Sequence, residues 1–568
     1  MMAKGRATTL ACGVALGCLA LCASGPLSEL VAMPPFPDSL RQGSPSMAAG
    51  IGLYSEMRGH FQERGICTPG GGMAAGITVS GDFNVLAICV DFSDKVSQVS
   101  ATVLDNLIFS TGSGSVRHFY SEMSYGNLTM VTVNLPSSLG WQRAPQTYAY
   151  YVNGNFGMGS YPNNTQRLTQ DLVALIDPLV DFSDYDNDGN GYVDGLVIMH
   201  SGAGAEFTGS VNDIWSHKWG ISANLRDGVY VSAYSVQPEY WNSPGDITIG
   251  VYAHEIGHLF GLPDLYDIDG SSRGLGRWSL MASGSWNGSL GNSPAHMDAW
   301  CKSQVGFVTP TVVSSNLTGV NLPAVETSPT VYRVWSDGAG GNQYFLIENR
   351  QKTGYDTGIP GSGLCIWHID DSQSGNTKEW YPGHTSSGNY WVALEQADGL
   401  WELEQNLDYG DGADPFPGTT NKTTFSAAST PNSDNYAGAQ TFVTITNISA
   451  SGPSMSADFS VTLETGIEDD RGLGTIDYEI DLFNYPNPFN PSTTIRFSSV
   501  GDQPVQLDVY DVLGRKVATL VDGLLAPGSH TVNWEGRGDN GRPVGSGVYF
   551  ARLVSDGVAR VHQMVLLR

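Results

Sequence analysis

The chain has 568 residues, of which 41% are hydrophobic, and it carries a formal net charge of -28 at pH 7. This length exceeds what one hydrophobic core normally supports, so we expect several domains. The acidic balance, without any strong concentration of basic residues, excludes a nucleic-acid-binding protein because phosphates could not be neutralised. The 70 glycines and 29 prolines indicate many turns and much β structure.

The N-terminus has the pattern of a secretory signal peptide over residues 1–24. Lys4 and Arg6 precede an apolar run at 11–23, and small residues near Gly25 offer a cleavage site. This run is too short for a comfortable transmembrane helix, and no other stretch approaches the required length. We therefore expect a secreted or cell-surface protein with no transmembrane segment in the mature chain. Residues 25–78 show few periodic signals and are interpreted as a propeptide.

Residues 79–309 alternate between predicted strands and predicted helices. The apolar run VLAICVDF at 85–92 is typical of a strand that is buried on both faces. Apolar residues at helical spacing predict helices at 115–123 and 166–179, and a second buried strand follows at 195–200. This order indicates an α/β domain in which helices pack on a twisted sheet.

An acidic loop, DYDNDGNGYVD, comes directly before the second buried strand. Oxygen-bearing side chains at alternate positions, with glycine at the sixth, suit a calcium-binding loop, because glycine permits the sharp turn. The loop departs from the EF-hand, since its twelfth position is Gly195 rather than an acid. We predict a shortened calcium loop with a structural role, and a polar surface turn is the alternative. The candidate calcium ligands are Asp184, Asp186, Asp188, Asn190 and Asp194.

The stretch VYAHEIGHLFGLPDLYDID at 251–269 contains His254 and His258 four positions apart. On a helix this spacing places both imidazoles on one face, where they can bind a single metal ion. Zinc suits them, because it takes neutral imidazole nitrogens at about 2.0–2.1 Å and leaves a position for water. Glu255 is placed to take the proton from that water, whose pKa zinc lowers to about 7.

Three features downstream extend this pattern. Gly261 lets the chain leave the helix and turn back, which would bring Asp264 to the metal as a third ligand. Met281, in WSLMASG, can form a methionine-bearing turn that is a hydrophobic floor beneath the metal. An HExxH sequence alone arises by chance in long chains, and an amphipathic helix with two surface histidines is the alternative. The three features together favour a metal site.

A zinc site also suggests a role for Cys67, which lies in the predicted propeptide directly before Thr-Pro-Gly-Gly-Gly. A thiolate is a good zinc ligand and could hold an enzyme latent. The alternatives are a cysteine without a role and one that pairs with another cysteine.

Residues 310–463 consist of short alternating runs separated by Gly, Asn and Pro, which predict an antiparallel β-sandwich. The acidic loop at 398–414 could hold a second calcium ion or could simply face solvent. Residues 464–480 are acidic, lack an apolar period and are predicted to be a linker. Residues 481–568 open on YPNPFNP soon after Asn484 and alternate apolar and polar residues, which predicts a small immunoglobulin-like β-sandwich.

The region from Phe83 to Gly418 resembles the immune inhibitor A family of secreted metalloproteases, a metzincin group. The resemblance is carried by NVLAICVDFSD, SVRHFYSEMSYGNL, DYDNDGNGYVDGLVIMHSGAG, HEIGHLFGLPDLYD, WSLMASGSWN, YFLIENRQ and GLCIWHID, in that order. It implies an α/β metzincin-like catalytic domain. It also implies the roles of the site residues. His254, His258 and Asp264 would bind zinc, Glu255 would act as the general base and acid, and Met281 would form the hydrophobic floor beneath the metal.

The C-terminal module resembles the immunoglobulin-like sorting domains of bacterial proteins that the type IX system exports. YPNPFNP at its start and GVYF before the terminal strand carry this resemblance. It implies recognition by the outer-membrane export machinery, and a plain accessory sandwich is the alternative.

Together these patterns predict a secreted zinc endopeptidase that requires zinc and structural calcium and acts on protein or peptide substrates. The alternative is a non-catalytic, surface-displayed binding protein with a protease-like domain. The presence of every expected catalytic residue weighs against that alternative.

Overall fold

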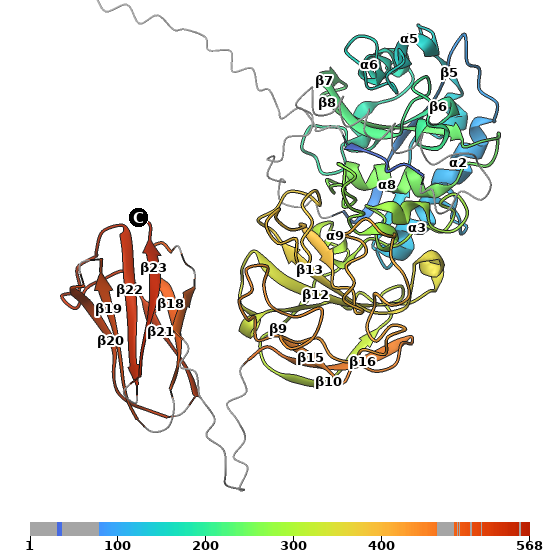
Figure 1. Ribbon diagram of the computed structural model, residues 1–568. Helices are drawn as coiled ribbons and strands as arrows, with labels where there is room; N and C mark the ends of the chain where they lie inside the picture. The colour runs from blue at the N-terminus through green and yellow to red at the C-terminus, as the bar shows by residue number, and fades with distance from the viewer. Residues whose placement is uncertain are drawn as a thin grey trace, which may run out of the picture. The chain divides into compact units, whose positions relative to one another are not determined.

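The computed structural model describes residues 31–36, 79–462 and 482–568, the last range with short gaps (Figure 1). The chain divides into two compact units, one up to Thr462 and one from Leu463 onward. The predicted signal peptide at 1–24, Cys67 with most of the predicted propeptide, and the predicted linker at 464–480 lie outside the described residues.

The first unit contains a six-stranded sheet in the order β1-β7-β8-β6-β3-β5. Its central strands, β3 (Leu86–Asp91) and β6 (Leu196–Ala203), are parallel to each other and almost completely buried. Side chains alternate along a strand, so β3 contributes Cys89 to one hydrophobic core and the neighbouring Ile88 to another. The two strands predicted from apolar runs are therefore present.

Helices cover both faces of this sheet (Figure 1). One core contains residues of α2 (Ala101–Phe109), α3 (Val116–Met123) and α8 (Ile249–Leu259). The other contains residues of α5 (Tyr148–Val152) and α6 (Thr165–Ile176). The predicted α/β architecture is confirmed. Smaller elements complete the region: β2 (Gly81–Asn84), β4 (Leu128–Val131), α4 (Pro136–Leu139), β5 (Gln142–Arg143), α7 (Ala205–Thr208), η4 (Ser283–Trp286) and α9 (Ala299–Gln304).

A long antiparallel hairpin, which no pattern in the sequence predicts, extends the sheet on one side. The hairpin joins β7 (His217–Arg226) to β8 (Val229–Tyr240) through Asp227, which has a φ of 49°. The two-residue strand β1 (Val31–Ala32) runs antiparallel to β7 and pairs with its outer edge. Residues of the predicted propeptide are thus part of the sheet of the α/β region.

The rest of the first unit is built from two sheets, ordered β14-β13-β12-β11-β9 and β10-β16-β15. The first sheet contains β9 (Thr311–Val313), β11 (Tyr332–Val334), β12 (Gln343–Arg350), β13 (Gly363–Asp370) and β14 (Val392–Leu394). The second contains β10 (Leu317–Pro323), β15 (Thr444–Thr446) and β16 (Ser454–Ser460). Side chains of both sheets form one core, as expected for stacked sheets. One pair departs from the antiparallel prediction: β9 and β11 are parallel, because the chain crosses to the second sheet through β10 between them.

The second unit consists of two antiparallel sheets, β17-β18-β21 and β20-β19-β22-β23. Its strands are β17 (Leu482–Tyr485), β18 (Thr493–Ser499), β19 (Gln503–Asp511), β20 (Lys516–Leu525), β21 (Gly528–Trp534), β22 (Gly547–Ser555) and β23 (Val558–Leu566). Leu507 and Val509, from the predicted alternation, lie in the shared core. In the part of the chain that the structure describes, no helix has the length and apolar character needed to span a membrane.

Candidate metal centre

The helix α8 carries both histidines of the motif in the interior of the α/β region. All its residues from Ile249 to His258 are buried. It packs closely at Gly257, where an added Cβ would lie 2.6 Å from the Met281 sulfur. Glycine at this position therefore lets the segment around Met281 pass directly beside the helix. Met281 is thus buried beside the helix that carries both histidines, and its role as a floor beneath the metal stays a prediction.

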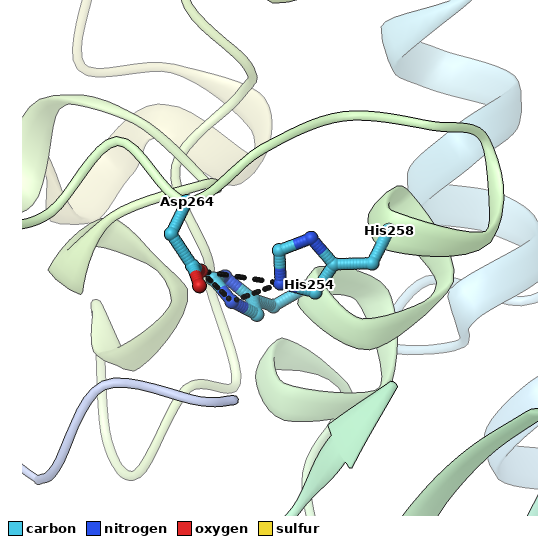
Figure 2. Close-up of side chains that lie close together, drawn as sticks. All are labelled: His254, His258 and Asp264. Carbon is cyan, nitrogen blue, oxygen red and sulfur yellow. Dashed lines mark hydrogen bonds and ion pairs between the residues drawn. The ribbon is translucent and has the colours of Figure 1, made fainter. Parts of the chain in front are cut away.

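The chain reverses after α8 and brings Asp264 back to the two histidines. Gly261 supports the reversal with a φ of 87°, and the Leu262 N–H donates to the Gly257 carbonyl at 3.2 Å. His254 Nε2 and His258 Nε2 lie 3.1 and 3.2 Å from Asp264 Oδ1, and 3.1 Å from each other (Figure 2). Three ligand atoms from a helix and the following loop thus form a nearly equilateral triangle.

Backbone carbonyls fix the protonation of the two imidazoles. His254 Nδ1 lies 2.8 Å from the Leu280 carbonyl, and His258 Nδ1 lies 2.8 Å from the Leu262 carbonyl. A carbonyl only accepts, so each Nδ1 carries the proton and each Nε2 of a neutral ring presents a lone pair. Burial also lowers the pKa of His254, which favours its neutral form.

Three acceptors therefore face one another without a proton between them, and this arrangement suits a cation. In tetrahedral coordination with bonds of about 2.0–2.1 Å, the ligand atoms lie about 3.3 Å apart. The three observed separations of 3.1–3.2 Å are close to this value. Burial raises the pKa of Asp264, but the neighbouring His258 and His254 offset this effect and hold it below the usual value, so the carboxylate stays ionised. The residues present fit a zinc ion.

Glu255 is the buried acid next to this triangle. Among the described residues, neither carboxylate oxygen has a hydrogen-bond partner with normal geometry, although the Met33 backbone N–H lies close enough to lower the pKa of Glu255. Burial raises the pKa of Glu255 well above its ordinary value, and the charges of Asp264 and Glu206 raise it further. An unsatisfied buried carboxylate beside a metal site is suited to accept and return a proton.

The predicted calcium loop brings together only part of the predicted ligand set. Carboxylate oxygens of Asp186, Asp188 and Asp194 all lie within 4.8 Å of one another. Asp184 is not in this group and is exposed in the short helix η2 (Phe182–Tyr185). The Asn190 side chain donates to Asp188 Oδ2 at 2.9 Å. Burial, together with the charges of Asp188 and Asp186, raises the pKa of Asp194 to about 6.

A second acidic loop also gathers carboxylates. Two overlapping groups of oxygens within 4.8 Å of one another occur there: Asp398, Asp411 and Asp414, and Glu402, Asp408 and Asp411. This is the loop in which the sequence allowed either a second calcium ion or a solvated surface.

Residues 31–36, for which the sequence predicts no more than a place in the propeptide, lie against this centre. The Tyr266 hydroxyl donates to the Ala32 carbonyl, and the Trp215 indole N–H donates to the Met33 carbonyl at 2.7 Å. The Trp286 indole N–H donates to the Pro34 carbonyl at 3.0 Å. The apolar, proline-rich character of VAMPPFP within an otherwise weakly patterned stretch was the available signal.

Comparison with known proteins identifies two regions of the chain. Residues 105–307, which contain the metal centre, match the Immune inhibitor A peptidase M6, catalytic domain. Residues 484–566 match the Secretion system C-terminal sorting domain. Both resemblances inferred from the sequence are confirmed, and with its sorting domain the protein is secreted or displayed at the cell surface.

Similar proteins include the pre-pro-metalloprotease PrtV of Vibrio cholerae serotype O1, which is 33% identical over 217 residues. The matched stretch covers 33% of this chain and 23% of PrtV. Immune inhibitor A of Bacillus thuringiensis subsp. alesti is 32% identical over 210 residues, covering 31% of this chain and 30% of that protein. The chain thus spans less than a third of the length of these relatives. These similarities support a metallopeptidase domain, for which zinc is the typical metal.

Dimeric latent PorU from Porphyromonas gingivalis is a solved structure that matches 20% of this chain and 11% of that chain. The TM-score is 0.15 and the sequence identity 23%, which is too low to support an argument about fold.

We expect Asp264→Ala to lose most of the bound zinc, because two imidazoles alone leave the ion without its anionic ligand. Asp269→Asn is the matched control, since Asp269 lies nearby in the same loop but outside the ligand triangle. Metal content per protein after desalting, measured by elemental mass spectrometry, distinguishes the two variants. Full zinc occupancy in Asp264→Ala would remove Asp264 from the ligand set.

Proposed function

We propose that this chain is a secreted, zinc-dependent endopeptidase of the metzincin type, with His254, His258 and Asp264 as zinc ligands. The observation that carries the proposal is the triangle of three unprotonated acceptors beside the unpartnered Glu255 carboxylate. When bound, zinc would supply a Lewis acid that lowers the pKa of a water molecule to about 7 and polarises the scissile carbonyl.

The protein groups around the site suit the remaining steps of peptide hydrolysis. Glu255 takes a proton from the attacking water and passes it to the amine that leaves. Tyr266, whose hydroxyl already donates to the Ala32 carbonyl, is placed to donate a hydrogen bond to a substrate carbonyl. The carbonyl of Leu280 holds His254 in the required tautomer, and Met281 supports the helix from below.

The rival proposal is a non-catalytic surface protein that keeps a protease-like domain for binding. Glu255 is the observation against it. Burying an ionisable carboxylate without a hydrogen-bond partner is costly, and a domain that only binds has no use for that cost.

We expect Glu255→Gln to keep zinc but to lower casein hydrolysis by about 10²–10⁴-fold, because the amide cannot accept the proton. Hydrolysis is followed by the release of acid-soluble peptides from chains whose N-terminal region has been processed. Zinc content and thermal unfolding, measured in parallel, show that the site and the fold are intact. Undiminished hydrolysis by this variant would refute the assigned role of Glu255, and a wild-type chain that binds zinc but cleaves nothing would favour the binding-protein alternative.

We further propose that the protein is made as a zymogen and that residues 31–36 keep it latent by occupying the cleft. Ala32, Met33, Pro34 and Phe36 are all buried against the α/β region. Four hydrogen bonds attach the backbone of residues 33–36: one from the Met33 N–H, one to the Met33 carbonyl, one to the Pro34 carbonyl and one from the Phe36 N–H to the Glu206 carbonyl at 3.1 Å. Latency through Cys67 remains the competing prediction from the sequence.

We expect Phe36→Asp to raise the peptidase activity of the unprocessed chain by at least about tenfold, because the buried charge would expel the segment. Pro35→Asp, which alters the adjacent and only half-buried residue, is the matched control and should have a smaller effect. Initial rates on a fluorogenic peptide are compared with those of Cys67→Ser. An increase in Cys67→Ser, with no change in Phe36→Asp, would assign latency to Cys67 instead.

The acidic loop around Asp186, Asp188 and Asp194 is proposed to bind a structural calcium ion. Its position supports a role in stability: Asn187, within the loop, receives a hydrogen bond from the Asn84 N–H at 2.6 Å and so attaches the loop to the end of β2. Three carboxylates packed together repel one another without a cation. The ion would therefore stabilise the connection that leads into β6.

We expect calcium to raise the unfolding temperature of the calcium-free, zinc-loaded protein at pH 7, and Asp186→Asn to remove most of that rise. Asp184→Asn should keep it, because the structure places Asp184 outside the cluster.

The stabilisation by calcium should weaken as the pH falls through about 6, where Asp194 takes up a proton in place of calcium. Since the pKa of Asp194 is raised in the folded state, the calcium-free protein gains stability over the same fall in pH. Differential scanning calorimetry measures all of these shifts, and a loss of the calcium effect in Asp184→Asn would restore that residue to the ligand set.

For the C-terminal unit we propose an immunoglobulin-like sandwich that the outer-membrane export machinery recognises. Its two stacked antiparallel sheets and its match to a sorting domain support this proposal.

A further inference from the structure

Residues 31–36 show how an extended peptide can lie along the edge strand β7, beside the metal centre. β1 runs antiparallel to the edge strand β7, with Ala32 opposite His217, and the next residue, Met33, donates its N–H to the Ser216 carbonyl at 3.0 Å. Addition of an extended segment to a free sheet edge is a general way in which proteins bind peptides, because the backbone hydrogen bonds do not depend on sequence. The segment therefore serves as a guide to where a substrate would lie.

Two contacts fix the register of this peptide relative to the metal centre. The Ala32 carbonyl accepts from the hydroxyl of Tyr266, whose ring centroid lies 6.4 Å from that of His254. On the other side of the same peptide bond, the Met33 backbone N–H lies near the Glu255 carboxylate. The bond between Ala32 and Met33 is thus the one at the catalytic groups, and Phe36 is the fourth residue on its carboxyl side.

Phe36 is held in a pocket made of aromatic rings. Its ring meets Trp286 edge-on at 4.9 Å and Phe207 at 5.6 Å between centroids. Trp241 forms the back of the pocket, with its ring 5.0 Å from Trp286 and 6.3 Å from Phe207. Only 6% of Phe36 is exposed, while Trp241 and Trp286 are completely buried.

The pocket belongs to the protein framework rather than to the segment. Phe207 lies in α7, Trp241 directly follows β8, and Trp286 ends η4. The Trp241 indole N–H donates to Thr248 Oγ1 at 3.2 Å, directly before α8, which ties the pocket to the helix that carries the metal ligands. Edge-on aromatic contacts of this kind favour an aromatic side chain over an aliphatic one.

We propose that Phe207, Trp241 and Trp286 form a specificity pocket that selects substrates with an aromatic side chain at the fourth residue after the cleaved bond. This inference rests on the proposed peptidase function. It assigns the substrate class as extended peptides or unfolded protein segments that carry Phe, Tyr or Trp at this position. Pro34 and Pro35 have no N–H to donate, so the two intervening positions need no backbone hydrogen bond from their nitrogens.

The test is digestion of a library of peptides by the processed, zinc-loaded enzyme, with mass spectrometry of the cleavage sites. Aromatic residues should be enriched at the fourth position after the cleaved bond. For a matched pair of fluorogenic peptides that differ only by Phe or Ala at this position, kcat/KM should differ by about 10- to 100-fold.

Two variants separate the pocket from a general loss of structure. Phe207→Ala removes a wall that is only partly buried and should abolish most of the difference in kcat/KM between the two peptides, while its unfolding temperature shows that the fold is intact. Trp219→Ala, which changes a partly buried tryptophan outside the pocket, should leave the discrimination unchanged.

Each outcome bears on a different proposal. Hydrolysis without a preference at the fourth position, or with an aromatic preference at another position, would overturn the specificity pocket and leave the peptidase function standing. Absence of hydrolysis of every peptide by the zinc-loaded wild type would overturn both. A preference that survives unchanged in Phe207→Ala would show that other groups select the aromatic residue.

Discussion

The crowding of His254, His258 and Asp264 is the constraint on which the rest of the α/β region depends. Three lone pairs within 3.1–3.2 Å of one another repel unless a cation lies between them, so the surrounding structure must hold them together. It does so with the Leu280 and Leu262 carbonyls, which fix both rings, and with a helix buried along almost its whole length. A loosely packed helix could not maintain this arrangement.

The β-sheets that follow the α/β region also support this centre. Arg350, at the end of β12, is completely buried and donates to both oxygens of Asp356 at 2.8 Å and to the Trp278 carbonyl at 3.2 Å. Asp356 accepts in turn from the His296 N–H, and the His296 carbonyl accepts from the Leu280 N–H. Burial raises the pKa of Asp356, but Arg350 outweighs it and holds the pKa far below its usual range. The buried ion pair between Arg350 and Asp356 is thus connected, through the backbone of His296, to Leu280, whose carbonyl orients His254.

Local spacing accounts for what the sequence could predict. Two histidines four apart on a helix, a glycine at the reversal and continuous apolar strands depend on neighbours in the chain, and the structure has each of them. The β7–β8 hairpin escaped prediction because HKWGISANLR mixes polar and apolar residues without a clear period. The placement of residues 31–36 depends on partners such as Trp286, more than two hundred positions away, which no local pattern encodes. Asp184 was wrongly grouped with the other carboxylates by its spacing in the sequence, since it lies in a short helix and outside their cluster.

The contact between Gly257 and Met281 has a consequence for sequence variation in this protein. A side chain at position 257 would overlap the sulfur at position 281, because the Cβ of any other residue would lie 2.6 Å from it. A larger residue at position 257 therefore requires the Met281 side chain to move aside or to be replaced by a shorter one. A variant library that randomises position 257 should therefore also vary position 281, so that a larger side chain in the helix can be combined with a shorter one in the turn.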